Sequence, residues 1–308
     1  MIWLVIGIAI YGITVAFSDA DKLRTALAQV GTFGWLTVIG LSSLNIGIRF
    51  VRWQYYLQTL GHAVPVIRSL EYFVAGFAFT STPAKAGEAL RSLYLKREGV
   101  AYTESLAALF VERLTDLIAV ILLALAAAYQ FEDYRWLVML AGIATLMILP
   151  VIHSQLPRNL LSKIAAGTSN PKISNGIKHL IELIKSSAAL LRSGPLYGGM
   201  LLSLLAASSV SLMMYVVLQL LHVDIGLPLA VGIYATGILV GALSFLPGGI
   251  GSAELVMIGL LVLAGVDATT AAAATLICRI AALWYSIAMG IIIVLRLEFK
   301  SGRTQENV

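Results

Sequence analysis

Charged side chains are scarce in this 308-residue sequence, where Lys, Arg, Asp and Glu together account for only 12% of the residues. Soluble domains carry about a quarter charged residues, so this composition argues against a soluble globular protein. Hydrophobic residues make up 59% of the chain, and the mean hydropathy is +0.90. The hydrophobic runs are long and do not alternate, which excludes a spanning barrel and predicts an all-α polytopic membrane protein.

Cysteine and histidine are also sparse. The single cysteine, Cys278, allows neither a disulfide framework nor a CxxC metal site. The four histidines lie near the ends of apolar runs and lack the spacing of metal ligands: His62, His153, His179 and His222. We therefore expect neither a metal nor a cofactor.

Sequence motifs of common enzyme classes are missing as well. The chain contains no Walker loop, no HExxH and no GxSxG, so an enzyme is not expected. The net charge of +5 does not indicate a nucleic-acid partner, because Lys and Arg lie mainly between apolar runs, as the positive-inside rule produces. Membrane lipids are the expected surroundings instead.

Six apolar runs are close to the roughly 20 residues that a helix needs to cross the bilayer. They cover approximately residues 2–17, 35–57, 106–129, 136–153, 196–221 and 268–295. The long polar segment 154–194 carries six Lys and Arg, which predicts a cytoplasmic connector and both termini on the same side of a bacterial or archaeal cytoplasmic membrane. Its apolar spacing leaves two interpretations open: an amphipathic helix on the leaflet surface or a solvated connector.

Two further apolar stretches, 66–98 and 228–265, are each interrupted by a Pro/Gly cluster. The clusters run from Pro83 to Glu88 and from Pro247 to Glu254. A proline inside a helix removes a hydrogen bond and clashes with the preceding turn, and the nearby glycines weaken the helix further. Each stretch is therefore predicted to form two short helices, either as a re-entrant hairpin or as two thin crossings.

The two interrupted stretches resemble each other, which predicts an internal repeat. Pro83 precedes Arg113 by about 30 residues, and Pro247 precedes Arg279 by a similar distance. We interpret residues 1–308 as one membrane domain with a first repeat at about 33–129 and a second at about 195–297. Three crossings separate equivalent points, so the repeats are expected to be inverted, a recurring plan of transporters.

Ionisable residues inside membrane helices are candidates for a functional site, because burying them costs several kcal/mol. A broken helix adds free backbone N–H groups and the positive end of a helix dipole, which favour an anion such as phosphate. We expect a phosphate-bearing headgroup to be bound by Lys85, Arg91, Arg113 and Arg279 together with Gly248, Gly249 and Gly251. Glu88, Glu112, Asp116 and Glu254 are expected to orient these cations or to bind a coupling proton.

A structural role for part of this set is the alternative. Glu112 and Asp116 are four residues apart on one helix face and could pair with Arg91 or Arg49, forming a buried ion network that holds helices together. Arg49 and Arg52 are also candidate charges inside the membrane, with the alternative that they extend from a predicted helix end toward the membrane interface.

Three of these segments resemble the lysylphosphatidylglycerol synthase transmembrane-region family: 245–254, 82–91 and Glu112-Arg-Leu-Thr-Asp116. The resemblance extends over about residues 5–297. The family includes the flippase domain of the bacterial multiple peptide resistance factor and stand-alone membrane proteins. Membership implies translocation of lipids such as aminoacylated phosphatidylglycerol or isoprenoid- and glycan-linked lipids. The aminoacyl-transferase domain of the resistance factor has no counterpart before Val308, so synthesis of lysylphosphatidylglycerol is not expected.

Together, the residues and the resemblance predict a flippase that moves an anionic phospholipid or a polyprenyl-phosphate-linked lipid. Two alternatives stay open: a membrane-embedded transferase acting on a lipid phosphate, and a non-transporting scaffold of a lipid-modifying complex. A second copy of the chain or a lipid-synthesising protein is the expected type of protein partner.

Overall fold

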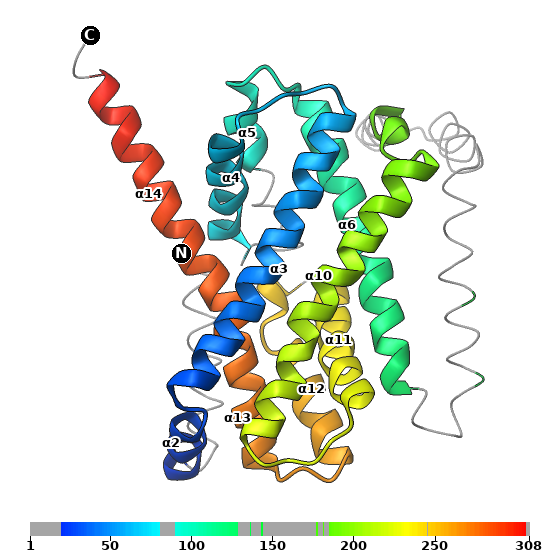
Figure 1. The fold of residues 1–308 in the computed structure, drawn as a ribbon, viewed down its shortest axis with the longest axis vertical. Coiled ribbons are helices and arrows are strands. Elements are labelled where there is room, and N and C mark those ends of the chain that lie inside the picture. Colours follow the sequence, from blue (N-terminus) through cyan, green and yellow to red (C-terminus); the bar gives the residue numbers. More distant parts are fainter. Residues whose placement is uncertain are drawn as a thin grey trace.

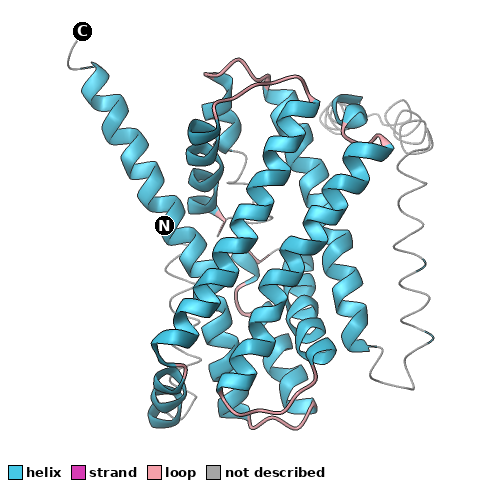
Figure 2. Cartoon of the chain, in the orientation of Figure 1, coloured by secondary structure: helices cyan, strands magenta, loops and turns pink. Residues whose placement is uncertain are grey.

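The computed structural model describes residues 20–80, 90–128, 136, 143, 177, 181, 185–244 and 246–305. Over these residues the chain is helical, without any strand (Figure 2), which confirms the predicted all-α membrane fold. The predicted span at 2–17, most of the span at 136–153, and most of the connector lie outside the described residues.

Long helices form where four of the spans are predicted. Among the described residues, three helical segments are long and apolar enough to cross a membrane: Gly31–Thr59 (α3), Ser193–Leu220 (α10) and Ala268–Phe299. The helix α6, Tyr102–Ala128, has 27 residues and matches the fourth prediction, although charged side chains interrupt its apolar sequence. The short helix α2, Ala20–Gln29, precedes α3.

The first interrupted stretch forms two short helices, as predicted. The helix α4 covers Val66–Ala75 and continues as the 3-10 turn η1, Gly76–Phe79, and α5 covers Leu90–Lys96. Ten residues of helix extend about 15 Å, which is half the hydrocarbon core. Figure 1 shows α4 and α5 side by side at the same end of the bundle, an arrangement that fits the predicted re-entrant hairpin.

The second interrupted stretch forms a hairpin that enters from the opposite end (Figure 1). It consists of α11, Leu227–Leu243, the 3-10 turn η5, Pro247–Gly249, and α12, Ser252–Leu263. Glycine is required at Gly249, because φ is +65° and an added Cβ would lie 2.9 Å from the Cα of Gly241. The turn can therefore pack directly against α11.

The last helix contains an irregular turn that the sequence pattern does not indicate. It begins as α13, Ala268–Arg279, passes through the π-helical turn η6, Ile280–Trp284, and continues as α14, Tyr285–Gln305. Helix α14 then crosses the first hairpin, where Gly290 packs against the backbone of η1. Turns of the π type occur frequently at functional sites.

Two hydrophobic clusters fill the bundle. One joins α10 to the second hairpin and α13, and the other joins α3, α4, α5 and α6 to the start of α10. The central helix α10 packs against α3, α6 and α11 and so connects the two clusters (Figure 1). An inverted repeat requires two hairpins that enter from opposite ends of the bundle, as these do. The repeat and its boundaries stay a prediction.

Candidate functional site

A buried ion network forms where α3, α5 and α6 meet. Arg52 of α3 places its Nη1 atom 2.5 Å from Oδ1 of Asp116 and its Nη2 atom 3.6 Å from Oε1 of Glu112. Arg91 of α5 pairs with the other oxygen of Glu112. Arg52 and Glu112 are fully buried, and Arg91 is 1% exposed. Buried charges cost several kcal/mol each unless they are paired, so α6 supplies the counter-ions that this position demands.

Further contacts extend the network to α10 and to the edge of the bundle. Arg52 donates hydrogen bonds to the hydroxyl of Thr115, at 3.5 Å, and to that of Ser203 on α10. Asp116 is also 3.9 Å from Arg49 and 3.6 Å from Arg113, both of which are partly exposed. We call the six charged residues the arginine cluster: Arg49, Arg52, Arg91, Arg113, Glu112 and Asp116.

Aromatic rings of the first half surround two of the arginines. The guanidinium carbon of Arg91 lies 4.0 Å from the ring centroid of Trp53 and 5.5 Å from that of Phe73. The guanidinium carbon of Arg49 lies 5.3 Å from the ring centroid of Phe77. Because a cation over a ring face is stabilised without any counter-charge, these rings help to hold both arginines in place.

Several buried hydrogen-bond donors of the arginine cluster have no hydrogen-bond partner among the described residues. They are the Nε groups of Arg52 and Arg91, and the indole N–H of the neighbouring Trp53 is in the same situation. Arg52 Nη2 and Glu112 Oε1 also lack a hydrogen bond, but they face each other as an ion pair at 3.6 Å. Buried polar groups are nearly always hydrogen-bonded. A surplus of donors over acceptors favours a ligand that is rich in acceptor oxygens, such as a phosphate or a carboxylate.

A second buried ion pair lies at the inner end of the second hairpin. Arg279 of α13 donates from Nε to Oε1 of Glu254 at 2.6 Å and from Nη2 to the carbonyl oxygen of Gly248 at 2.9 Å. Glu254 accepts a further hydrogen bond from the Gly251 N–H at 2.7 Å, which caps the start of α12. The two charged side chains are 3% and 6% exposed. The carboxylate therefore fixes the glycine turn and the arginine together.

The glycines of this turn have uses other than the predicted one. Gly248 offers its carbonyl oxygen to Arg279, Gly249 packs against Gly241, and the Gly251 N–H is bound to Glu254. In the described geometry, the turn therefore positions Arg279. Contact between these glycines and a headgroup stays a prediction.

The structure divides the predicted site residues into two groups. Arg91, Arg113, Glu112 and Asp116 belong to the arginine cluster, whereas Arg279 of α13 lies with Glu254, Gly248 and Gly251 at the turn of the second hairpin. The pairing of Glu112 with Arg91 and of Asp116 with Arg49 matches the ion network that the sequence left open as an alternative. Lys85 and Glu88 lie outside the described residues.

Of the two interpretations open for Arg52, the structure favours the intramembrane charge: Arg52 does not extend to the membrane interface but lies fully buried at the centre of the arginine cluster. Seven residues separate it from the end of α3 at Thr59, about 10 Å along the helix axis. That depth could have identified it as an interior residue. No comparable signal indicates its partner Ser203, which is an ordinary residue of an apolar span.

Comparison with known proteins agrees with the architecture. Residues 4–290 match the family described as the lysylphosphatidylglycerol synthase TM region. A UPF0104 membrane protein of Methanothermobacter thermautotrophicus is 29% identical over 70% of each chain. A UPF0104 membrane protein of Pyrococcus horikoshii is 22% identical over 95% of this chain and 96% of its own. The match covers both hairpins and the arginine cluster, so the chain belongs to the lysylphosphatidylglycerol synthase transmembrane-region family.

Proposed function

We propose that this protein is a flippase that moves an anionic phospholipid or a polyprenyl-phosphate-linked lipid across the cytoplasmic membrane. Its family is named after the membrane region of a synthase that makes a lipid, lysylphosphatidylglycerol. Its interior contains buried arginines, although charged residues are rare inside membrane proteins. The lipid chains would stay in the bilayer while the headgroup passes through the bundle.

The arginine cluster is the observation that carries this proposal. Arg52 and Arg91 share the carboxylate of Glu112, yet each keeps at least one buried N–H group without a hydrogen-bond partner among the described residues. A phosphate oxygen entering there would satisfy these donors. It would also compete with Glu112 for the same guanidinium groups.

Arg279 provides a second cationic position for the headgroup. It lies at the inner end of the hairpin that enters from the opposite side, held by Glu254. An anionic headgroup that leaves the arginine cluster would thus meet another arginine in the second half of the molecule. Two cationic positions, one beside each hairpin, suit alternating access better than a single fixed site.

Chemistry on the lipid has less support than its movement. In a transferase, Asp116 or Glu112 would act as a base or bind a metal ion. Asp116 instead lies 2.5 Å from Arg52, and Glu112 pairs with Arg91, so both carboxylates already balance buried cations. We accordingly propose transport without covalent change, driven by an ion gradient, by a lipid gradient or by a partner.

Transport in proteoliposomes tests the proposal directly. The purified chain is reconstituted with labelled phosphatidylglycerol or a labelled polyprenyl phosphate, and the exchange of lipid between leaflets is followed over time. The wild type should exchange at least one of these lipids. Arg52→Gln should slow exchange by about tenfold or more, because one lost charge-assisted hydrogen bond is worth roughly 1.5–3 kcal/mol.

Arg68→Gln is the matched control, since Arg68 is exposed and pairs with Glu98 at 3.2 Å outside the cluster. It should exchange lipid at the wild-type rate. Size-exclusion chromatography confirms that each variant is folded before reconstitution. A wild-type protein that moves none of these lipids, or an Arg52→Gln protein that is fully active, would contradict the proposal.

A further inference from the structure

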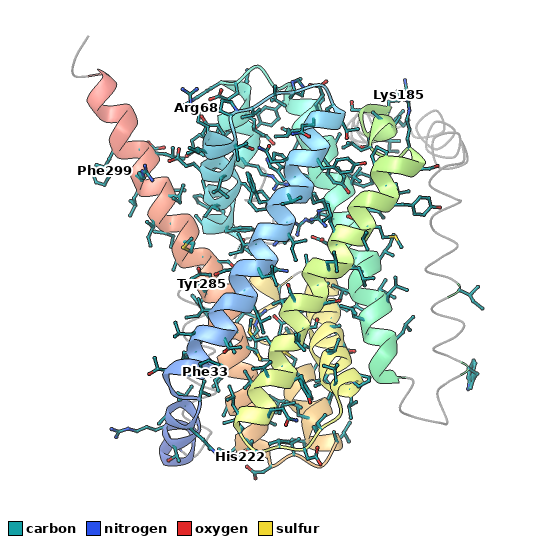
Figure 3. The ribbon with its side chains drawn as sticks, in the orientation of Figure 1. Phe33, Arg68, Lys185, His222, Tyr285 and Phe299 are labelled. Atoms are coloured by element: carbon teal, nitrogen blue, oxygen red, sulfur yellow. The ribbon has the colours of Figure 1, made fainter. Side chains whose placement is uncertain are left out.

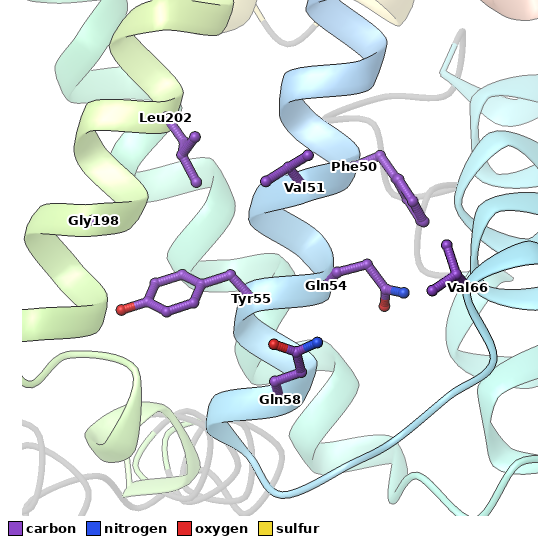
Figure 4. A pocket seen from close by; sticks show the side chains of 8 residues that line it. All are labelled: Phe50, Val51, Gln54, Tyr55, Gln58, Val66, Gly198 and Leu202. Atoms are coloured by element: carbon purple, nitrogen blue, oxygen red, sulfur yellow. The ribbon is translucent and has the colours of Figure 1, made fainter.

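A groove of about 550 Å³ lies on the face of α3 that turns away from the arginine cluster, between α4 and α10. Figure 4 shows side chains of α3 pointing into it, with Val66 on one side and Gly198 and Leu202 of α10 on the other. Its volume falls in the usual range of ligand sites, about 300–1,000 Å³. The lining residues are Phe50, Val51, Gln54, Tyr55, Gln58, Val66, Gly198 and Leu202.

The groove changes from polar to apolar along α3. Gln58 lies one residue before the end of the helix, at the end of the bundle that carries Arg68 and Lys185 and is predicted to face the cytoplasm (Figure 3). Phe50 lies about 12 Å deeper along the axis. A lipid in the adjacent leaflet has the same gradient, with its headgroup at the interface and its chains directed toward the midplane.

The walls of the groove are continuous with the surface that faces lipid. Both α3 and α10 are long enough to span the membrane, and Val51, within the groove, is 55% exposed. On α10 the neighbouring Leu201 and Leu205 are 59% and 49% exposed. A molecule can therefore enter from the bilayer sideways, without crossing water, and the occupant that the surroundings supply is a lipid.

The polar groups of the groove are uncharged and able to donate as well as accept. Gln54 accepts a hydrogen bond from the buried Ser69 hydroxyl at 3.0 Å, which leaves its amide N–H groups to a ligand. Gln58 adds a second amide one turn further along, and Tyr55 adds a phenol. Amides and phenols match hydroxyl groups, which also donate and accept, whereas a charged amine or a bare phosphate would call for a lining side chain of opposite charge.

We propose that this groove binds a lipid with a hydroxyl-bearing headgroup, such as a glycerol or a sugar attached through phosphate, from the leaflet at the predicted cytoplasmic end. The inference rests on the proposed flippase function and narrows its substrate class. Gln54 follows Arg52 by two residues on α3, so the groove and the arginine cluster occupy opposite sides of the same turns. The groove recognises the hydroxyl groups before the phosphate reaches the arginines.

Binding to the full-length protein tests the groove separately from transport. Native mass spectrometry in detergent measures the Kd for two lipids with identical acyl chains, phosphatidylglycerol and phosphatidic acid. Phosphatidic acid lacks the glycerol headgroup. The wild type should bind phosphatidylglycerol at least about fivefold more tightly. Tyr55→Phe combined with Gln58→Leu removes two hydrogen-bonding groups and should weaken phosphatidylglycerol binding by about tenfold, because each lost hydrogen bond weakens binding by roughly threefold. Binding of phosphatidic acid should change little.

A second variant fills the groove instead of changing its polarity. A Cβ atom at Gly198 would lie 3.3 Å from the ring of Tyr55, so Gly198→Leu should block lipid entry and slow phosphatidylglycerol exchange by tenfold or more. Gly47→Leu on α3 is the control, because a Cβ there meets nothing within 4 Å.

The outcomes separate the two proposals. Equal binding of both lipids, or unchanged binding and exchange in both groove variants while the wild type transports, would overturn the groove and leave the flippase intact. Selective binding that both variants abolish, without transport by the wild type, would support the groove and contradict the flippase.

Discussion

Replacing Glu112 by Gln should destabilise the protein strongly, because Arg52 and Arg91 share this carboxylate inside the bundle. The Oε1 atom lies 3.6 Å from Arg52 Nη2, and a unit-charge pair at such a distance attracts by roughly 4 kcal/mol at an effective dielectric constant of about 20. A neutral Gln is easier to bury, which offsets part of this loss. Removing one partner of a buried ion pair typically costs about 3–5 kcal/mol. Because Glu112 pairs with two buried arginines, we expect Glu112→Gln to lower the free energy of unfolding by an amount in that range.

Thermal unfolding in detergent, followed by fluorescence-detected size-exclusion chromatography, measures the effect. Glu112→Gln should lower the apparent Tm far more than the control variant Glu104→Gln does. The Glu104 side chain is 35% exposed and pairs with His62 at 2.8 Å, so its loss should cost little. Adding Arg91→Gln to Glu112→Gln should restore part of the lost stability, because the uncompensated cation is then removed. A Glu112→Gln protein as stable as Glu104→Gln, or a double variant whose loss equals the sum of the single losses, would refute the reasoning.

Two further predictions concern the second hairpin. Arg279→Ala should reduce lipid exchange to the protein-free rate while membrane insertion stays intact. The control Arg296→Ala, which removes an exposed arginine, should exchange lipid normally. An active Arg279→Ala protein would contradict the second cationic position. Gly249→Ala should lower thermal stability through both its φ of +65° and the 2.9 Å approach to Gly241, at a total cost of about 2–4 kcal/mol. Gly265→Ala, with φ +90° and open space around its Cβ, should show only the backbone part of that cost, and equal losses would show that the close approach is unimportant.

Sequence reasoning predicted the features of the fold that depend on local chemistry. The prolines and glycines around Pro247 terminate α11 and form the turn η5, and the apolar runs reappear as α3, α6, α10 and the last helix. It also anticipated that Glu254 would hold an arginine, since the carboxylate follows the glycine turn directly and lies at the first turn of α12.

The part of the candidate site that could not be predicted depends on contacts between distant helices. Arg52 and Ser203 are 151 residues apart, and neither helix shows by its own pattern which neighbour it will face. Helical spacing indicated that Glu112 and Asp116 share a face, but the choice among Arg49, Arg52 and Arg91 is made by how closely α3 and α5 pack against α6. An apolar bundle offers many packing arrangements of similar composition, and only the three-dimensional arrangement selects one.

The π-helical turn at Ile280–Trp284 has a consequence for how the two ends of the last helix are aimed. One surplus residue in a turn rotates everything beyond it by about 100° relative to a regular helix. Arg279 can thereby face Glu254 before the turn while Gly290 faces η1 after it. Deleting a single residue between 280 and 284 would restore a regular helix, and the arginine and the glycine could then no longer reach their partners at the same time. By rotating one end of the helix relative to the other, the surplus residue lets the same helix contact both hairpins.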